Sequence, residues 1–146
     1  MSDTFVVDAS IGIKLFLAEQ YADEVADLFH SDALLLVPDL FHIECTNILW
    51  KRVTRGLYPL QSAKDNLADL YAMRLPTTPT AELMARALEL ATTYGTTAYD
   101  ACYLVLAEMH SVPLLTADTA LHTAVIGSPI QALTIPEYLA AGIASR

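Results

Sequence analysis

The sequence predicts an α/β fold, a three-layer α/β/α sandwich in which helices cover both faces of a central parallel sheet. Short runs of β-branched and aliphatic residues alternate with longer amphipathic segments, which is typical of parallel strands joined by helical crossovers. The chain has 146 residues, the size of one domain, and contains no repeat, low-complexity segment or linker. We therefore expect a single domain over residues 1–146.

The first predicted strand ends at a carboxylate. The run 5–7 is β-branched and too short for a helix, Asp8 follows it directly, and Ser10 is the expected N-cap of the next helix. Ligands of parallel sheets bind at the carboxyl ends of strands, so Asp8 marks the edge where a site is expected. Further strands are predicted over 33–37, 73–75, 113–116 and 132–135.

Helices are predicted between these strands from apolar residues at helical spacing and from signals at helix ends. Asp39 is the expected N-cap of a long helix that Gly56 stops, and Gly95 closes a later helix. The stretch 76–80, rich in proline and threonine, is predicted to be a loop. The predicted helices cover 11–18, 20–30, 39–55, 60–71, 81–94, 97–110, 118–126 and 136–141.

The chain is acidic, with a net charge of −9. This charge argues against a passive nucleic-acid-binding module, since such modules are normally basic. It is compatible with an enzyme whose acidic site holds metal ions, because the ions supply positive charge. No apolar run approaches the ~18 residues of a membrane span, and the N-terminus lacks the basic region of a signal peptide. With two cysteines that fit reduced, buried thiols, we expect a cytoplasmic protein with no membrane attachment.

Four carboxylates are predicted to meet at one edge of the sheet. Asp8 and Asp118 follow strands, whereas Glu44 and Asp100 stand in early turns of helices that start from the same edge. Each has an ordinary alternative when taken alone. Asp8 or Asp118 could simply cap a helix, Glu44 could be solvated, and Asp100 stands three residues after Thr97 at capping-box spacing. Together the four acids indicate a site.

Four converging carboxylates need a counter-charge. At about 4 Å each pair would repel by ~4 kcal/mol at an effective dielectric of 20, and protonation or a divalent cation must relieve that repulsion. Ligand sets made only of oxygen favour hard ions such as Mg²⁺ or Mn²⁺. Ser10 and Thr116 stand two positions from Asp8 and Asp118 and could orient these acids by hydrogen bonds.

Four motifs, in order along the chain, resemble those of PIN-domain ribonucleases. The short single-domain form is similar to the VapC-type toxins of VapBC toxin–antitoxin pairs. The motifs are Phe5-Val6-Val7-Asp8-Ala9-Ser10, Pro38-Asp39-Leu40 followed by Glu44, Tyr99-Asp100-Ala101-Cys102-Tyr103-Leu104, and Leu114-Leu115-Thr116-Ala117-Asp118.

The resemblance implies a PIN-like, Rossmann-like fold and a role for each of these acids. Asp8, Glu44, Asp100 and Asp118 would be the catalytic, metal-binding residues, with Ser10 and Thr116 beside them. Lys14 stands where such toxins often carry a basic residue. The chain departs from the family pattern at one place, since Thr119 and Ala120 follow Asp118 where such proteins often carry basic residues.

Other candidates for RNA contact are basic or aromatic. Lys51, Arg52 and Arg55 cluster at the end of a predicted helix, where they could contact an RNA backbone or simply complement the helix dipole. Tyr99 and Tyr103 flank Asp100, and we expect them to pack in the core rather than to stack on bases. Trp50 is expected at a helix hairpin or at a partner interface.

From these features we expect a Mg²⁺-dependent endoribonuclease, the toxin of a type II pair, that cleaves RNA phosphodiester bonds by metal-activated water. By resemblance its partners would be a small basic antitoxin and a second copy of the chain. One alternative is a PIN nuclease that acts in RNA processing without an antitoxin. Another is an acidic phosphoryl-transfer or receiver-type domain, although Ser10 replaces the second acid of the former and no lysine follows the late strand 113–116 as in the latter.

Overall fold

The computed structural model describes residues 3–142 and contains a parallel five-stranded sheet in the order β3-β2-β1-β4-β5. β1 lies at its centre, with Phe5 beside Leu35 of β2 and Val7 beside Leu115 of β4. The strands are β1 (Thr4–Val7), β2 (Leu34–Pro38), β3 (Thr77–Thr78), β4 (Leu114–Leu115) and β5 (Ala132–Leu133).

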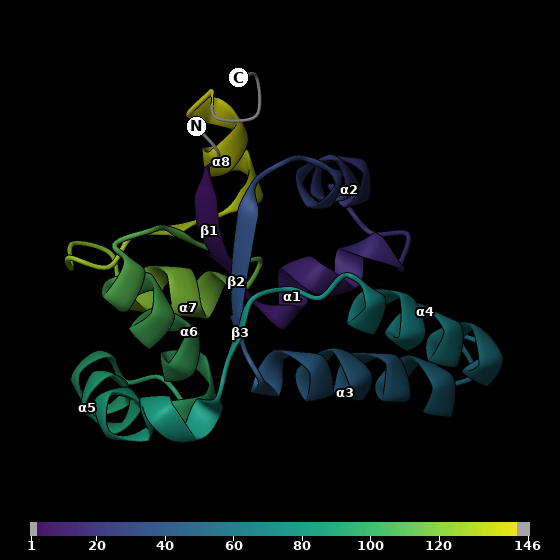
Figure 1. The fold of residues 1–146 in the computed structure, drawn as a ribbon, viewed down its shortest axis with the longest axis horizontal. Helices are drawn as coiled ribbons and strands as arrows, with labels where there is room; N and C mark the ends of the chain where they lie inside the picture. Colours follow the sequence, from purple (N-terminus) through teal and green to yellow (C-terminus); the bar gives the residue numbers. More distant parts are fainter. Residues whose placement is uncertain (1–2, 143–146) are drawn as a thin grey trace.

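Helices cover both faces of this sheet, so the predicted three-layer α/β sandwich is confirmed. Figure 1 shows α1 to α4 on one side of the strands and α5, α6 and α7 on the other. The α6 helix packs against the central strands and buries seven consecutive residues, 101–107. The helices are α1 (Ala9–Gly12), the 3₁₀ turn η1 (Ile13–Leu15), α2 (Ala22–His30), α3 (Leu40–Thr54), α4 (Leu60–Ala72), the 3₁₀ turn η2 (Thr80–Leu83), α5 (Met84–Tyr94), α6 (Ala98–His110), α7 (Thr119–Ala124) and α8 (Ile135–Ala140).

The chain leaves β1 and β4 toward opposite faces of the sheet. After β1 it enters α1 on one side, and after β4 it enters α7 on the other (Figure 1). Between two adjacent parallel strands whose connections diverge in this way, the carboxyl ends leave a crevice that ligands occupy. Asp8 and Asp118 lie at this point.

The prediction of a strand over 73–75 is wrong. The segment turns there, with Arg74 in the left-handed region at φ 50°, and β3 lies within the stretch predicted to be a loop. β3 carries no apolar alternation and is flanked by Pro76 and Pro79, which is tolerated because it is an edge strand. It is held by backbone bonds from Val37 N to Pro76 O and from Asp39 N to Thr78 O.

Two predicted helix starts also differ. The first helix is two short pieces, α1 and η1, and its N-cap is Asp8 rather than Ser10. Asp39 does not cap α3 with its side chain, because its carboxylate instead accepts bonds from the backbone and hydroxyl of Thr80. Among residues 3–142, no helix is long and apolar enough to cross a membrane.

A close contact between α1 and α3 requires glycine at position 12, because glycine has no side chain. A Cβ added at Gly12 would lie 2.6 Å from Cζ of Phe41, which is fully buried. The backbone at Gly12 is ordinary right-handed helix, so the close approach, rather than backbone conformation, requires glycine here. This contact fixes α3 against the start of the chain and thereby sets the position of Glu44.

We predict that Gly12→Ala lowers the free energy of unfolding by about 1–3 kcal/mol, because the added methyl group must displace the Phe41 ring in a close-packed core. Thermal or urea denaturation would measure this loss. In a Phe41→Leu background the same substitution should cost less, since the ring atoms that clash are gone. An equal loss in both backgrounds would show that the ring is not the obstacle.

Candidate functional site

A cavity of about 550 Å³ lies at the carboxyl ends of β1 and β4, and all four predicted acids line it. α3, α6, the start of α1 and the residue before α7 contribute its walls. The lining residues are Asp8, Ala9, Ser10, Leu40, Ile43, Glu44, Asn47, Ile48, Lys51, Tyr99, Asp100, Tyr103 and Asp118.

Asp8 is buried at the end of the central strand, with 6% of its surface exposed. Its Oδ1 accepts bonds from Ser10 Oγ at 2.5 Å and from the amide of Ile11 at 3.2 Å, and its Oδ2 accepts a bond from Thr116 Oγ1. Both carboxylate oxygens are therefore held in place. Ser10 orients Asp8 as predicted, whereas Thr116 donates to Asp8 and not to the carboxylate of Asp118.

The same hydroxyls link β1 to the segment after β4. Ser10 Oγ accepts a bond from Ala117 N at 2.9 Å, and Thr116 Oγ1 accepts one from Asp118 N at 3.0 Å. Asp8 is thus connected to the backbone that carries Asp118 through two side chains. Thr116 is completely buried, so this linkage is part of the core as well as of the site.

Asp118 caps α7 and also lines the cavity. Its Oδ1 accepts bonds from Ala120 N at 2.9 Å and Leu121 N at 3.1 Å. The alternative that Asp118 caps a helix is therefore confirmed. No hydrogen bond to its Oδ2 occurs within residues 3–142. Capping therefore occupies one carboxylate oxygen and leaves the other for a ligand.

Glu44 is oriented by a residue whose role the sequence did not reveal. Tyr103 OH donates to Glu44 Oε1 at 2.5 Å, and Tyr103 is buried, with 1% of its surface exposed. The prediction that Tyr103 packs in the core is confirmed, but its hydroxyl also reaches across from α6 to α3. Its place three residues after Asp100 was the available signal, because residues three apart share a helix face.

Asp100 stands in the first turn of α6. Thr97 caps the helix by accepting a bond from Asp100 N at 3.1 Å, but Thr97 N donates no bond to the Asp100 carboxylate in the described residues. The capping-box alternative is therefore only half formed. The carboxylate of Asp100 stays in the cavity.

Burial and mutual repulsion raise the pKa of three of these acids. Burial raises the pKa of Asp8 to about 6, its hydrogen bonds oppose this, and the charge of Asp100 adds to it. Burial and the charge of Asp100 likewise raise the pKa of Glu44, and burial and the charge of Asp118 raise that of Asp100. Asp100 is the acid that couples the other three electrostatically.

The predicted basic residues separate into different roles. Lys14 and Arg52 both form ion pairs with Glu19, at 3.4 and 3.0 Å, and neither lines the cavity. Arg55 follows α3 as its C-cap and also lies outside the cavity. Lys51 is the one lysine or arginine among the lining residues, so the structure brings only this predicted RNA contact to the acids.

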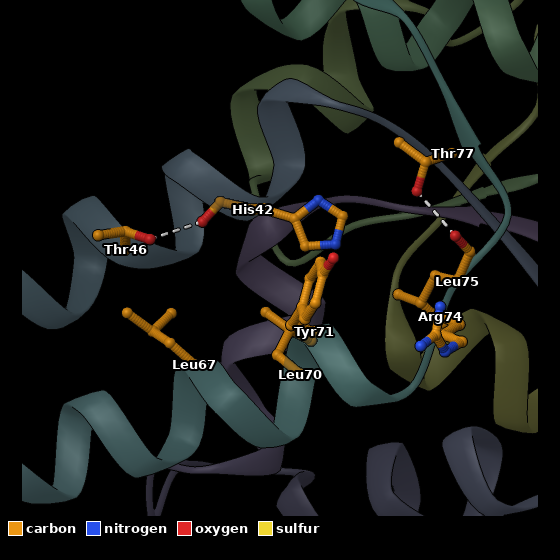
Figure 2. A pocket seen from close by; sticks show the side chains of 8 residues that line it. All are labelled: His42, Thr46, Leu67, Leu70, Tyr71, Arg74, Leu75 and Thr77. Carbon is orange, nitrogen blue, oxygen red and sulfur yellow. Dashed lines mark hydrogen bonds between the residues drawn. The ribbon is translucent and has the colours of Figure 1, made fainter.

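A second hollow, of about 520 Å³, lies between α3 and α4 (Figure 2). It is lined by His42 and Thr46 of α3, by Tyr71 and Arg74, and by apolar residues, and no carboxylate lines it. His42 and Thr46 are not among the residues that line the acidic cavity. The second hollow is therefore separate from the cavity that the four acids line.

Comparison with known proteins assigns the family. The profile described as PIN domain matches residues 5–125, which include all four acids. Ribonuclease VapC3 from Pyrobaculum aerophilum is 35% identical over 118 residues, covering 80% of this chain and 90% of that protein. The chain belongs to the PIN-domain family.

Solved structures agree with this PIN fold. PAE2754 from Pyrobaculum aerophilum superposes with a TM-score of 0.75 at 23% identity, covering 99% of this chain and 91% of that one. VapBC2 from Rickettsia felis, bound to a DNA fragment from its promoter, gives a TM-score of 0.60 at 9% identity, covering 90% and 98%. At these identities the likeness concerns the fold.

The donors of this PIN domain suit a hard divalent cation. All four acids offer oxygen, the pKa values of three are raised by burial and by one another, and no histidine or cysteine lines the cavity. In the part of the chain that the structure describes, no three acidic, histidine or cysteine side chains stand close enough to form a finished metal cage. The chemistry of the donors fits, although their present arrangement is open.

We predict that the metal-free protein becomes more stable as the pH falls from 7 to 5. Because the pKa of Asp8 is about 6 in the folded chain and 3.8 ordinarily, the folded state takes up a proton that the unfolded state does not. The free energy of unfolding should rise by about 1 kcal/mol over this range, with Glu44 and Asp100 acting in the same direction. Chemical denaturation at several pH values in EDTA would measure it.

Asp8→Asn should flatten this rise, because the amide does not ionise. Asp39→Asn serves as the control. The pKa of Asp39 is lowered by its bonds from Thr80, so any stability it contributes is lost only below about its ordinary value of 3.8, outside the measured range. A free energy of unfolding that falls from pH 7 to 5 would contradict the raised pKa of Asp8. The same conclusion would follow if Asp8→Asn left the rise unchanged.

Proposed function

We propose that this PIN domain is a Mg²⁺- or Mn²⁺-dependent endoribonuclease and the toxin of a type II toxin–antitoxin pair. The observation that carries the proposal is the gathering of Asp8, Glu44, Asp100 and Asp118 in one cavity at the crevice of the sheet. Its relative Ribonuclease VapC3 supports the activity by its name. The proposed substrate is RNA, and the proposed place of action is the cytoplasm, where RNA is abundant.

The four acids would hold the divalent cation. A bound ion supplies Lewis acidity at the scissile phosphate and lowers the pKa of an attacking water. The chain's own residues fix the ligands: Ser10 and Thr116 hold both oxygens of Asp8, and Tyr103 holds one oxygen of Glu44. Their role is to keep the acids in place, so that little reorganisation is needed when substrate arrives.

Raised pKa values make the site depend on pH. Near neutral pH a fraction of Asp8 is protonated, and this proton must leave before the carboxylate can act as a ligand. Binding of a cation therefore releases protons and weakens as the pH falls through about 6. The charge of Asp100 helps to raise the pKa values of Asp8 and Glu44, so it adds to this dependence on pH.

The exposed apolar surface supports a protein partner. Trp50 on α3 is 57% exposed, and Leu57 in the turn after α3 and Leu60 at the start of α4 are exposed as well. Large apolar side chains gathered on a monomer surface commonly mark an interface. A small antitoxin with an apolar segment and a basic side chain directed at the acidic cavity would match both features. Met84 and Leu88, exposed on α5, would suit the proposed homodimer.

We predict that the purified protein cleaves single-stranded RNA only with Mg²⁺ or Mn²⁺, and that Asp100→Asn lowers the rate at least about 100-fold. Even residues that merely orient metal ligands typically contribute 10- to 100-fold, and Asp100 couples the whole cluster. Fragments should end in 5′-phosphate and 3′-hydroxyl groups, because no histidine lines the cavity to activate a ribose hydroxyl. Gel assays and end-group mapping would test this.

Two controls accompany this experiment. Asp69→Asn, which removes an exposed carboxylate on α4, should cleave like the unmodified protein. Mg²⁺ at a hundred times its dissociation constant should stabilise the unmodified protein by ~2.7 kcal/mol, and Asp100→Asn should lose most of that gain. Cleavage in EDTA, or 2′,3′-cyclic phosphates as the main product, would overturn the metal-dependent mechanism.

We predict that the copurifying partner is a small protein that inhibits cleavage and binds less tightly in high salt. Trp50→Ala should weaken the complex about 10-fold or more, since buried tryptophans often dominate interfaces, whereas Thr54→Ala, on the same helix, should not. Titration calorimetry of the purified components would measure both. A partner that leaves nuclease activity intact, or the absence of any inhibitor, would favour the alternative of an RNA-processing nuclease.

A further inference from the structure

The cavity extends beyond its acids along one face of α3. Ile43, Asn47 and Lys51 follow one another at intervals of four residues, so they lie in a row on this helix. Tyr99, from the first turn of α6, lines the same cavity. Nothing in the metal site uses these four side chains, yet all are exposed.

Tyr99 and Tyr103 lie four residues apart on α6 but have opposite environments. Tyr103 is buried and bonded to Glu44, whereas Tyr99 is 69% exposed. Within residues 3–142, the hydroxyl of Tyr99 has no hydrogen-bond partner and its ring has no aromatic neighbour. The prediction that Tyr99 packs in the core is therefore wrong. Its apolar ring lies in water beside Asp100.

Lys51 is a cation free to meet an anion. In the described part of the chain it forms no ion pair, whereas Lys14, Arg52 and Arg86 are all paired with glutamates. Seven residues separate Lys51 from Glu44, which is about 10 Å along the axis of α3 at 1.5 Å per residue. The cavity therefore carries negative charge at one end and a single unpaired positive charge at the other.

Asn47 lies between these two ends of the cavity. Its side-chain amide can both donate and accept hydrogen bonds, and it makes none within residues 3–142. An exposed ring, a free amide and a free cation lining one hollow are the features that bind a single-stranded nucleotide. The ring stacks on the base, the amide meets the edge of the base, and the cation meets a phosphate.

We propose that Tyr99, Asn47 and Lys51 form a subsite for one unpaired nucleotide next to the scissile bond, an inference that rests on the proposed ribonuclease function. Tyr99 stacks on its base, and Lys51 contacts the phosphate on the side away from the acids. Bases within a duplex are already stacked, so the subsite selects unpaired RNA. Stacking tolerates every base, and Asn47 contributes the preference among them.

Binding is tested with a single-stranded RNA oligonucleotide that carries 2-aminopurine, whose emission falls when it stacks. Asp8→Asn provides a non-cleaving parent. Tyr99→Ala in this parent should bind about 10-fold or more weakly and lose the quenching, because stacking is the interaction removed. Tyr99→Phe should retain both. The matched control is Tyr71→Ala, since Tyr71 is 74% exposed at the second hollow (Figure 2) and should not matter.

The phosphate contact has its own readout. Lys51→Ala should weaken binding for all sequences and reduce the slope of log affinity against log salt by about 0.7, the value for one phosphate of a single strand. Lys64→Ala, which removes an exposed lysine of α4 outside the cavity, should leave that slope unchanged. In the otherwise unmodified enzyme, Tyr99→Ala should raise KM for single-stranded RNA more than it lowers kcat.

Three outcomes overturn the subsite, and they differ from failure of the function itself. If Tyr99→Ala cleaves and binds like its parent, the nuclease function stands and the subsite does not. The same holds if duplex RNA binds as well as single strands. If Tyr99→Ala instead dissociates a dimer with unchanged RNA affinity per subunit, Tyr99 is a self-association contact. If the unmodified protein cleaves no RNA with either ion, the function fails, and the subsite with it.

Discussion

The buried carboxylate of Asp8 is the constraint on which the rest of the structure depends. A charge at the end of the central strand is costly unless hydrogen bonds compensate its burial, and Ser10, Thr116 and the amide of Ile11 provide those bonds. Two of the donors also bond to the segment after β4, so the bonds that hold Asp8 join the two strands that flank the crevice. The fold and the site thus share the same interactions.

The acidity of the chain has its local counterpart in this cavity. Four carboxylates face a single lysine there, and burial, with a smaller contribution from their mutual repulsion, raises the pKa values of Asp8, Glu44 and Asp100. A positive charge that enters this cavity would relieve the repulsion. A divalent ion, or a basic side chain of an inhibitor, would meet this one electrostatic need, which explains how one site could serve both catalysis and its control.

The positions of the four acids at one edge of the sheet could be predicted from the sequence, because strand ends and helix starts are set by local patterns. Asp8 follows an unmistakable strand, and parallel topology brings Asp118 to the same edge. It misplaced β3, because a strand of two threonines between prolines has no periodicity and exists only through its bonds to β2. The bond from Tyr103 to Glu44 and the pairing of Arg52 with Glu19 join residues far apart in sequence, so no local pattern identifies the partners.

The two tyrosines of α6 differ in exposure, which the sequence did not predict. Spacing of four predicts a shared face, and both do line the cavity. The buried run of α6 begins only at Ala101, so its first turn extends past the core that encloses Tyr103. One residue therefore positions a carboxylate from inside the protein, and the other presents an aromatic ring to the solvent above it. Exposure, which periodicity does not encode, separates an orienting role from a ligand-binding one.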